Sequence, residues 1–377
     1  MNWNNGFTSS FYVTVVDRDS WEDTDRIEIM DGKVNRSSDD LMQSADFTCR
    51  DFPVNQELLV RIYCDALQSG ESVHEAIFTG FATLPQREYE GRLKEHPVKC
   101  YSILQAAEDV MLPVGWYAPI GIDGAQLVKR LLGVIGAPTE VAEGSTPLSA
   151  AIISEDKENH LSMSLKILKA IGWRLRINGY GRIEVCPMAQ TPVAQYDPFT
   201  ADGIKPRISV SDDWYKCPNV FRAISGDSVA VARDDSPDSV LSTVSRGREV
   251  WESESSCDFA ENESIAHYAM RRLNELQKVA FTVKYDRRYN PRIAVGDLIW
   301  LNYPEQDVVG VFESVSQSVD LSPGMETSEE VQKVNIDIYT ASEAIGTDVT
   351  GGFGRMVLPD NVYAVMPDSK RVKVYNQ

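Results

Sequence analysis

The sequence has no apolar run of the roughly 20 residues that a membrane-spanning helix requires, so a helical membrane protein is excluded as the expected class. The segment Met1–Phe7 has no basic stretch followed by an apolar one, and we expect folding in the cytoplasm without a secretory signal. Cys-x-x-Cys pairs and neighbouring histidine pairs are also missing among the six cysteines. This spacing argues against a zinc site or a disulfide framework and favours free, buried thiols.

Basic residues are scarce, with 37 Lys and Arg against 56 Asp and Glu and a formal net charge of −19. A general nucleic-acid-binding protein needs a basic surface to neutralise phosphates, so this balance excludes that class. An acidic surface suits a conduit that DNA passes without binding, and it equally suits an ordinary soluble surface. With 377 residues, the chain is long enough for about two to four domains.

Complete catalytic motifs are missing as well. His74-Glu75 begins like the zinc-protease motif His-Glu-x-x-His, but the second histidine position is occupied by Phe78. His267 falls beside an apolar helical stripe, which favours a packed or half-exposed side chain. No Gly-x-Ser-x-Gly segment occurs, and Gly179–Gly181 is interpreted as a hairpin turn rather than a phosphate-binding loop.

Two acidic pairs, Asp234/Asp235 and Glu252/Glu254, superficially resemble the carboxylate pair of a glycosidase. No aromatic cleft is indicated near either pair, so we interpret both as solvated surface. We therefore expect a non-enzymatic protein with no catalytic residues, no metal site and no cofactor site.

The sequence does contain many short strand patterns, and residues 1–100 are interpreted as a first small β-barrel domain. Asp31-Gly32 is a hairpin-type pair, and Gly80 falls where a bulge or a barrel corner is expected. Three segments with strand character support this domain: Phe11–Val16, Leu58–Tyr63 and Ala76–Thr83.

Residues 101–204 are interpreted as an α/β domain. Apolar residues at helical spacing predict helices over Gly124–Ile135 and Ser162–Ile171, the second ended by Gly172. Trp173–Ile177 and Arg182–Cys186 flank an Asn-Gly pair and predict a β-hairpin.

Residues 205–341 are interpreted as a second β-barrel domain, interrupted by a helix-containing insertion at 236–279. The amphipathic helix Ile265–Val279 is expected to be capped by Asn262 or Asp258. Residues 342–377 form a Gly-rich linker and a C-terminal arm. The predicted fold class is thus α+β and mostly β, with two small barrels flanking an α/β domain. Four strands are expected here: Phe281–Tyr285, Leu298–Leu301, Val309–Val319 and Val334–Tyr339.

This order of segments, over about residues 8–341, resembles the central baseplate hub or late-control-D-like tail proteins of tailed bacteriophages. That family is related to the N-terminal part of type VI secretion spikes. Individual motifs are weak, and their order and spacing carry the resemblance. The first is the β region ending in Phe78–Gly80, and the second is Leu112–Ile135 followed by Leu165–Val185. The third is Asn219–Gly226 with the helix at 265–279, and the fourth is Val295–Asp297 before a strand, followed by Val311–Val315.

The resemblance implies a structural hub in the virion, assembled in the host cytoplasm. Two barrels in each of three chains would form a pseudo-sixfold ring that joins the tail tube to the tip, spike or fibre. The ring would line the path of passing DNA, without specific DNA binding and without membrane insertion by this chain. Two alternatives remain open, a peptidoglycan-degrading tail enzyme and a host-surface adhesin.

The basic C-terminal arm is either a disordered terminus or a segment that docks on a neighbour by adding a strand to a sheet edge. On the second interpretation, deleting residues 346–377 should leave the trimer folded but weaken its attachment to the next tail component. A pull-down with tail-tip proteins measures this, and unchanged binding by the truncated chain would contradict it.

Overall fold

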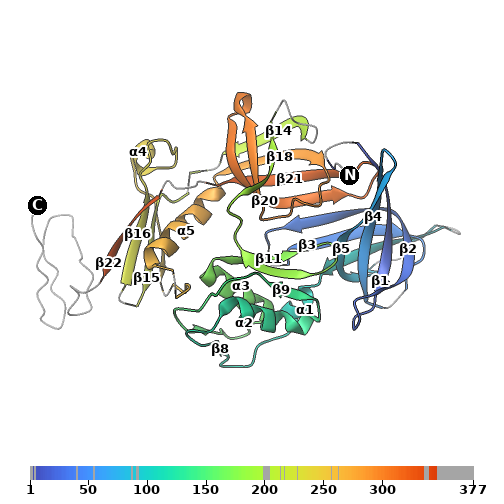
Figure 1. The fold of residues 1–377 in the computed structure, drawn as a ribbon, viewed down its shortest axis with the longest axis horizontal. Helices are drawn as coiled ribbons and strands as arrows, with labels where there is room; N and C mark the ends of the chain where they lie inside the picture. Colours follow the sequence, from blue (N-terminus) through green and yellow to red (C-terminus); the bar gives the residue numbers. More distant parts are fainter. Residues whose placement is uncertain are drawn as a thin grey trace, which may run out of the picture.

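The computed structural model of the chain describes residues 3, 6–39, 41–53, 56–85, 88–90, 93–197, 204–212, 214–215, 217–226, 228–255, 257–261, 263–334 and 339–345. Its architecture is mostly β, with the few helices gathered below and beside the strands (Figure 1). The described strands form one 13-stranded sheet and three smaller sheets of four, three and two strands. This confirms the predicted mostly-β fold class.

The first lobe is a ring of strands that closes on itself. Its pairing order is β1-β4-β5-β7-β3-β2, and β2 pairs back onto β1. Apolar residues from alternate positions fill its interior, among them Val13, Ile62 and Phe78, each 0% exposed. Its strands are β1 (Thr8–Val16), β2 (Asp23–Ser37), β3 (Gln43–Cys49), β4 (Leu58–Gln68), β5 (Glu71–Thr83), β6 (Glu88–Glu90) and β7 (Leu93–Ser102).

The second lobe has the pairing order β13-β19-β20-β21-β18-β14, with no pairing between β13 and β14 in the described chain, and it has its own apolar core. The two lobes are joined because the last part of β2 pairs with the end of β20, from Lys33↔Asp320 to Ser37↔Ser316. The strands are β13 (Pro192–Tyr196), β14 (Ile204–Asp212), β18 (Phe281–Arg288), β19 (Leu298–Tyr303), β20 (Val308–Asp320) and β21 (Glu326–Lys333).

The structure contradicts one prediction about a glycine and one of the two alternatives given for a second. Asp31-Gly32 is not a turn, because both residues lie inside β2, where the pairing with β3 shifts register between Ile29 and Asp31. Gly80 is not at a bulge, since the register shift between β4 and β5 falls at Ile77 instead. A Cβ at Gly80 would lie 2.2 Å from the carbonyl oxygen of Tyr101, so the close approach of β7 explains this glycine.

The middle unit lies below both lobes in Figure 1 and contains both predicted helices. Asn159 and Ser162 form a capping box at the start of α3, and Gly172, with φ 68°, ends it as predicted. Strands β11 and β12 pair as the predicted antiparallel hairpin. The elements are α1 (Gln105–Glu108), β8 (Tyr117–Ala118), α2 (Gly124–Leu131), the 3₁₀ turn η1 (Leu132–Ile135), β9 (Thr139–Val141), β10 (Ile152–Ile153), α3 (His160–Ile171), β11 (Trp173–Ile177) and β12 (Ile183–Pro187).

The predicted helical insertion belongs to a separate side unit, at the left of Figure 1, in which α5 covers a four-stranded sheet. Two of its strands precede residue 236 and one follows residue 338, so the unit is larger than the insertion at 236–279. Ser264 caps α5, whereas Asn262 and Asp258 were predicted. The elements are β15 (Val220–Ser225), β16 (Ser228–Asp234), α4 (Thr243–Arg246), β17 (Trp251–Ser255), α5 (Ile265–Lys278) and β22 (Tyr339–Ile345).

Three sequence predictions are not tested by these elements. The domain limits at 1–100, 101–204, 205–341 and 342–377 stay predictions, because strand pairing alone does not define domain boundaries. The predicted strand Val334–Tyr339 lies largely outside the described residues, with β21 ending before it. The C-terminal arm beyond Ile345 also lies outside them.

A fully buried ion pair connects the neighbouring strands β18 and β21 in the second lobe. The Nε atom of Arg287 lies 2.5 Å from Oε2 of Glu329, and both side chains are at most 1% exposed. The hydroxyls of Tyr285 and Ser314 and the amide of Gln317 also donate to this carboxylate. Burial acts to raise the pKa of Glu329, but the charge of Arg287 and these donors outweigh it and hold the pKa below its usual value.

We expect Glu329→Gln to lower the free energy of unfolding by about 3–5 kcal/mol, because it leaves the Arg287 charge buried without a partner. The matched control is Glu330→Gln, whose partner Lys284 is 61% exposed, with an expected loss below about 1 kcal/mol. Urea unfolding at several pH values measures both. Since the folded-state pKa is lowered, the difference between wild type and Glu329→Gln should be complete above about pH 4.3 and shrink as the pH falls further. Equal losses for the two variants would contradict the assignment.

Candidate functional site

The residues singled out as possible metal or catalytic groups lie apart from one another. Within the described chain, no group of three or more His, Cys, Asp and Glu side chains is placed to hold a metal ion. His74 lies on the first lobe, with Nδ1 2.6 Å from Oδ1 of Asp65 and its ring stacked on Tyr63. His267 is exposed on α5. All six cysteines are free, and only Cys186 is not buried.

One of the acidic pairs was misinterpreted. Asp234 is 0% exposed, whereas the sequence predicted a solvated carboxylate. Its carboxylate accepts hydrogen bonds from the Ser236 backbone, the Ser239 hydroxyl and the Gln277 amide. Burial nevertheless raises its pKa above the usual value. Asp234 therefore holds the loop after β16 against α5, which is a structural role.

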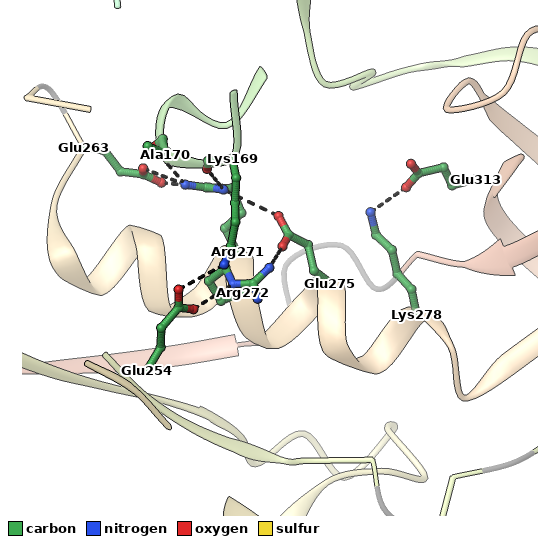
Figure 2. A network of polar contacts seen from close by, with 9 residues as sticks. All are labelled: Lys169, Ala170, Glu254, Glu263, Arg271, Arg272, Glu275, Lys278 and Glu313. Carbon is green, nitrogen blue, oxygen red and sulfur yellow. Dashed lines mark hydrogen bonds and ion pairs between the residues drawn. The ribbon is translucent and has the colours of Figure 1, made fainter. Parts of the chain in front are cut away.

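Charged side chains gather where α5 meets the neighbouring units. No helix in the described part is long and apolar enough to span a membrane. The side unit has an apolar core of its own beside α5, and ionic contacts add to its attachment to the neighbouring units. We call the cluster of charged residues that α5 forms with neighbouring elements the junction network. Figure 2 shows its side chains: Lys169, Glu254, Glu263, Arg271, Arg272, Glu275, Lys278 and Glu313.

Arg271 is the centre of this network. Its Nη2 lies 2.9 Å from Oε2 of Glu263, at the start of α5. The same guanidinium donates to the carbonyl oxygens of Lys169 and Ala170, at 3.0 and 3.4 Å, in the last turn of α3. Those carbonyls carry the negative end of the helix dipole, which a cation stabilises. Arg271 therefore attaches the side unit to the middle unit.

A second connection runs through Glu254 of β17. Its two carboxylate oxygens accept from Nζ of Lys169 at 3.0 Å and from Nε of Arg272 at 3.3 Å. Burial acts to raise the pKa of Glu254, but Lys169 and Arg272 outweigh it and leave the pKa below its usual value. Glu254 thus stays ionised between two cations from different units. It was predicted to be solvated surface, whereas its side chain is only 29% exposed.

The third connection reaches the second lobe. Nζ of Lys278, in the last turn of α5, lies 2.5 Å from Oε2 of Glu313 on β20, and both side chains are 19% exposed. The network therefore connects α5 to the middle unit and to the second lobe (Figure 2). Other residues of α5 pack on β15 and β16. The sequence predicted the helix but no contact of Arg271, Arg272 or Lys278 with another unit. Their alternation with Glu263 and Glu275 along one face was the available signal.

The β11–β12 hairpin makes a separate set of contacts and lies between the two lobes. At its tip, the Gly179 carbonyl accepts from the Thr79 hydroxyl at 2.7 Å, and a Cβ at Gly179 would lie 1.7 Å from the Ala76 carbonyl oxygen. At its base, Arg174 and Arg176 lie 2.9 and 3.3 Å from the buried carboxylate of Asp297 in the second lobe. Gly179–Gly181 is thus a turn, as predicted, and it docks on β5.

We expect Arg271→Met to lower the free energy of unfolding by about 1.5–3 kcal/mol, because charged hydrogen bonds to Glu263 and to α3 are lost. Backbone amides at the end of α3 should also exchange faster with solvent. Arg182→Met is the matched control, since Arg182 and its partner Glu140 are 47% and 61% exposed, and it should change stability by less than about 1 kcal/mol. Unchanged exchange at the end of α3 in Arg271→Met would show that the network does not hold the units together.

Comparison with known proteins gives structural neighbours only. No protein-family model matches the sequence, and no curated protein matches it. A tail protein from Neisseria meningitidis MC58 superimposes with a TM-score of 0.60 at 13% identity, covering 87% of this chain and 96% of that one.

Two prophage proteins superimpose over a similar range. The 43 kDa tail protein of prophage MuSo2 from Shewanella oneidensis gives a TM-score of 0.60 at 12% identity, covering 86% of this chain and 98% of that one. Prophage tail protein gp18 from Listeria monocytogenes EGD-e gives 0.51 at 12% identity, covering 87% of this chain and 96% of that one. The chain therefore has the fold of these phage tail proteins, as the resemblance in its sequence indicated.

Proposed function

We propose that the chain is a non-enzymatic hub of a phage or phage-like tail tip, in which three copies form a pseudo-sixfold ring between tail tube and tip. The observation that carries the proposal is a repeat of strand topology. In the first lobe the order is β4-β5-β7-β3-β2, and in the second it is β19-β20-β21-β18-β14. Every neighbouring pair in both series is antiparallel, and the strands occur in the same chain order.

This repeat supports a ring because it gives each chain two similar blocks. Three chains then present six similar blocks on one face, while the side and middle units keep threefold symmetry on the other. Such an object fits between a sixfold tube and a threefold tip. The tail proteins with the same fold support the setting, although their low identity supports no particular partner.

One surface suits the wall of a DNA channel. Since β2 pairs with β20, the outer faces of the two lobes form one continuous sheet surface. Charges of opposite sign alternate across four neighbouring strands, in the order Lys99, Asp46, Lys33 and Asp320. Further along, Lys284 pairs with Glu330 at 2.8 Å, and Ser328 donates to Asp286 at 2.6 Å. Cations that are paired in this way are less available to phosphates, so DNA would pass without binding.

The alternatives lack a comparable observation. A peptidoglycan-degrading enzyme would need a nucleophile, metal or carboxylate constellation, and the acidic residues considered for that role serve as structural contacts. An adhesin would bind glycans as an isolated monomer. Release of soluble fragments from purified cell walls tests the first alternative, and glycan binding by the monomer tests the second.

The proposal predicts a solution mass near three times the 42.1 kDa chain mass, measured by light scattering over a range of concentrations. Class averages of the same sample in the electron microscope should show a ring with six similar blocks. A stable dimer, or a ring without an internal twofold repeat in each chain, would contradict it.

A further inference from the structure

The outer strand of the second lobe, β14, presents an unusually open edge. Within the described chain it pairs only with β18, so its other side has no strand partner. Arg207 and residues 209–212 are exposed, and Val210 is 43% exposed. An unpaired edge of this kind is a template for another strand and is normally covered or blocked in folded proteins. We therefore expect another strand to cover the open edge of β14.

The repeat of topology indicates which strand this is, because β14 occupies in the second lobe the position that β2 occupies in the first. The pairing ends in the same way in both lobes, since the end of β2 or β14 lies opposite the first residue of β3 or β18, in the pairs Arg36↔Gln43 and Asp212↔Phe281. The side of β2 that corresponds to the open side of β14 is paired with the end of β20. By the same repeat, β14 should pair with whatever corresponds to the end of β20 in a first lobe.

That counterpart is β6. In the second lobe, β20 runs along β21 from Phe312 to Val319 as one strand, with a register shift between Ser314 and Ser316. In the first lobe, the equivalent strand β7 is followed first by β5, over Gly80–Thr83, and then by β6, over Glu88–Glu90. Strands β5 and β6 together therefore correspond to β20, with β6 in the place of its end. In the described chain β6 pairs with β7 alone, so its outer edge is also open.

We propose that β14 of one copy pairs with β6 of the neighbouring copy, and that this pairing repeats between chains the β2–β20 contact made within each chain. The inference rests on the proposed trimer and specifies its interface. Within one chain, six strands separate β14 from β6 along the sheet: β18, β21, β20, β2, β3 and β7. We therefore assign the β6 that pairs with β14 to a second copy. At about 4.8 Å per strand, that path along the sheet is roughly 30 Å long.

The two strands also have complementary charge in their sequences. Strand β14 contains two basic residues, Lys205 and Arg207, and one acidic residue, Asp212, and β6 is Glu88-Tyr89-Glu90. Opposite charges on paired strands stabilise a sheet, and like charges destabilise it. A chain with net charge −19 would repel its own copies, so a local basic strand opposite a local acidic one selects this pairing over others.

Charge reversal tests the pairing. We expect Arg207→Glu to raise the chain concentration at which half of the trimer dissociates by about tenfold or more, because the repulsion recurs at three interfaces. The double variant Glu88→Lys/Glu90→Lys should have a similar effect, and combining it with Arg207→Glu should restore the wild-type value. Arg130→Glu, an exposed arginine at the end of α2, is the matched control and should leave the trimer unchanged. Light scattering measures all five chains, and thermal unfolding confirms that each is folded.

Hydrogen exchange gives an independent readout that does not depend on the variants. Amides of residues 88–90 and 207–212 should become protected at concentrations where the trimer forms, and those of α2 should not change. A trimer that survives all reversals, with both segments unprotected, would overturn the β14–β6 pairing and leave the hub proposal intact. A wild-type chain that stays monomeric at every concentration would overturn both.

Discussion

Strand β2 is the constraint on which the arrangement of the molecule depends, because it belongs to both lobes. Its first half pairs with β1 and closes the first ring, and its second half pairs with β3 on one side and β20 on the other. A continuous strand cannot bend freely, so the two lobes have a fixed relative orientation. Gly32 lies at the change of partner, where a Cβ would be 2.6 Å from the Asp46 carbonyl oxygen. Val319, Leu321 and Met325 then extend into the first core and make the junction apolar as well.

The side unit is attached by a different kind of interaction. Its core, around Tyr268 and Leu273, is separate from the cores of the lobes, and the junction network holds it through charged hydrogen bonds. Partly exposed ion pairs contribute less free energy than buried apolar surface and are screened by salt. The junction between the lobes therefore rests on strand pairing and apolar packing, whereas charged contacts contribute a larger share at the side unit.

Local sequence signals predicted local structure well and long-range structure poorly. Helical periodicity and Gly172 gave α3 and its end, and the Asn-Gly pair gave the β11–β12 hairpin, because these features depend on neighbours in the sequence. The Asp31-Gly32 pair led to a wrong prediction, because a glycine that favours a turn also allows a neighbouring strand to approach the backbone closely, as β3 does at Gly32. Asp234 and Glu254 were assigned to the surface because their partners, Gln277, Lys169 and Arg272, are distant in sequence. The repeat of the lobes was visible only as two strand-rich halves, because the order of strands in a sheet is not encoded locally.

The difference between the lobes is as informative as their likeness. In the first lobe, β1 pairs with β4 in antiparallel fashion and closes onto β2. In the second, β13 pairs with β19 in parallel and does not reach β14 in the described chain, so that lobe stays open. A closed barrel has no unpaired edge strand, so the open second lobe supplies the long edge, β14, with which a neighbouring copy could pair. In the proposed ring, each junction between copies would use this long edge together with the short open edge of β6.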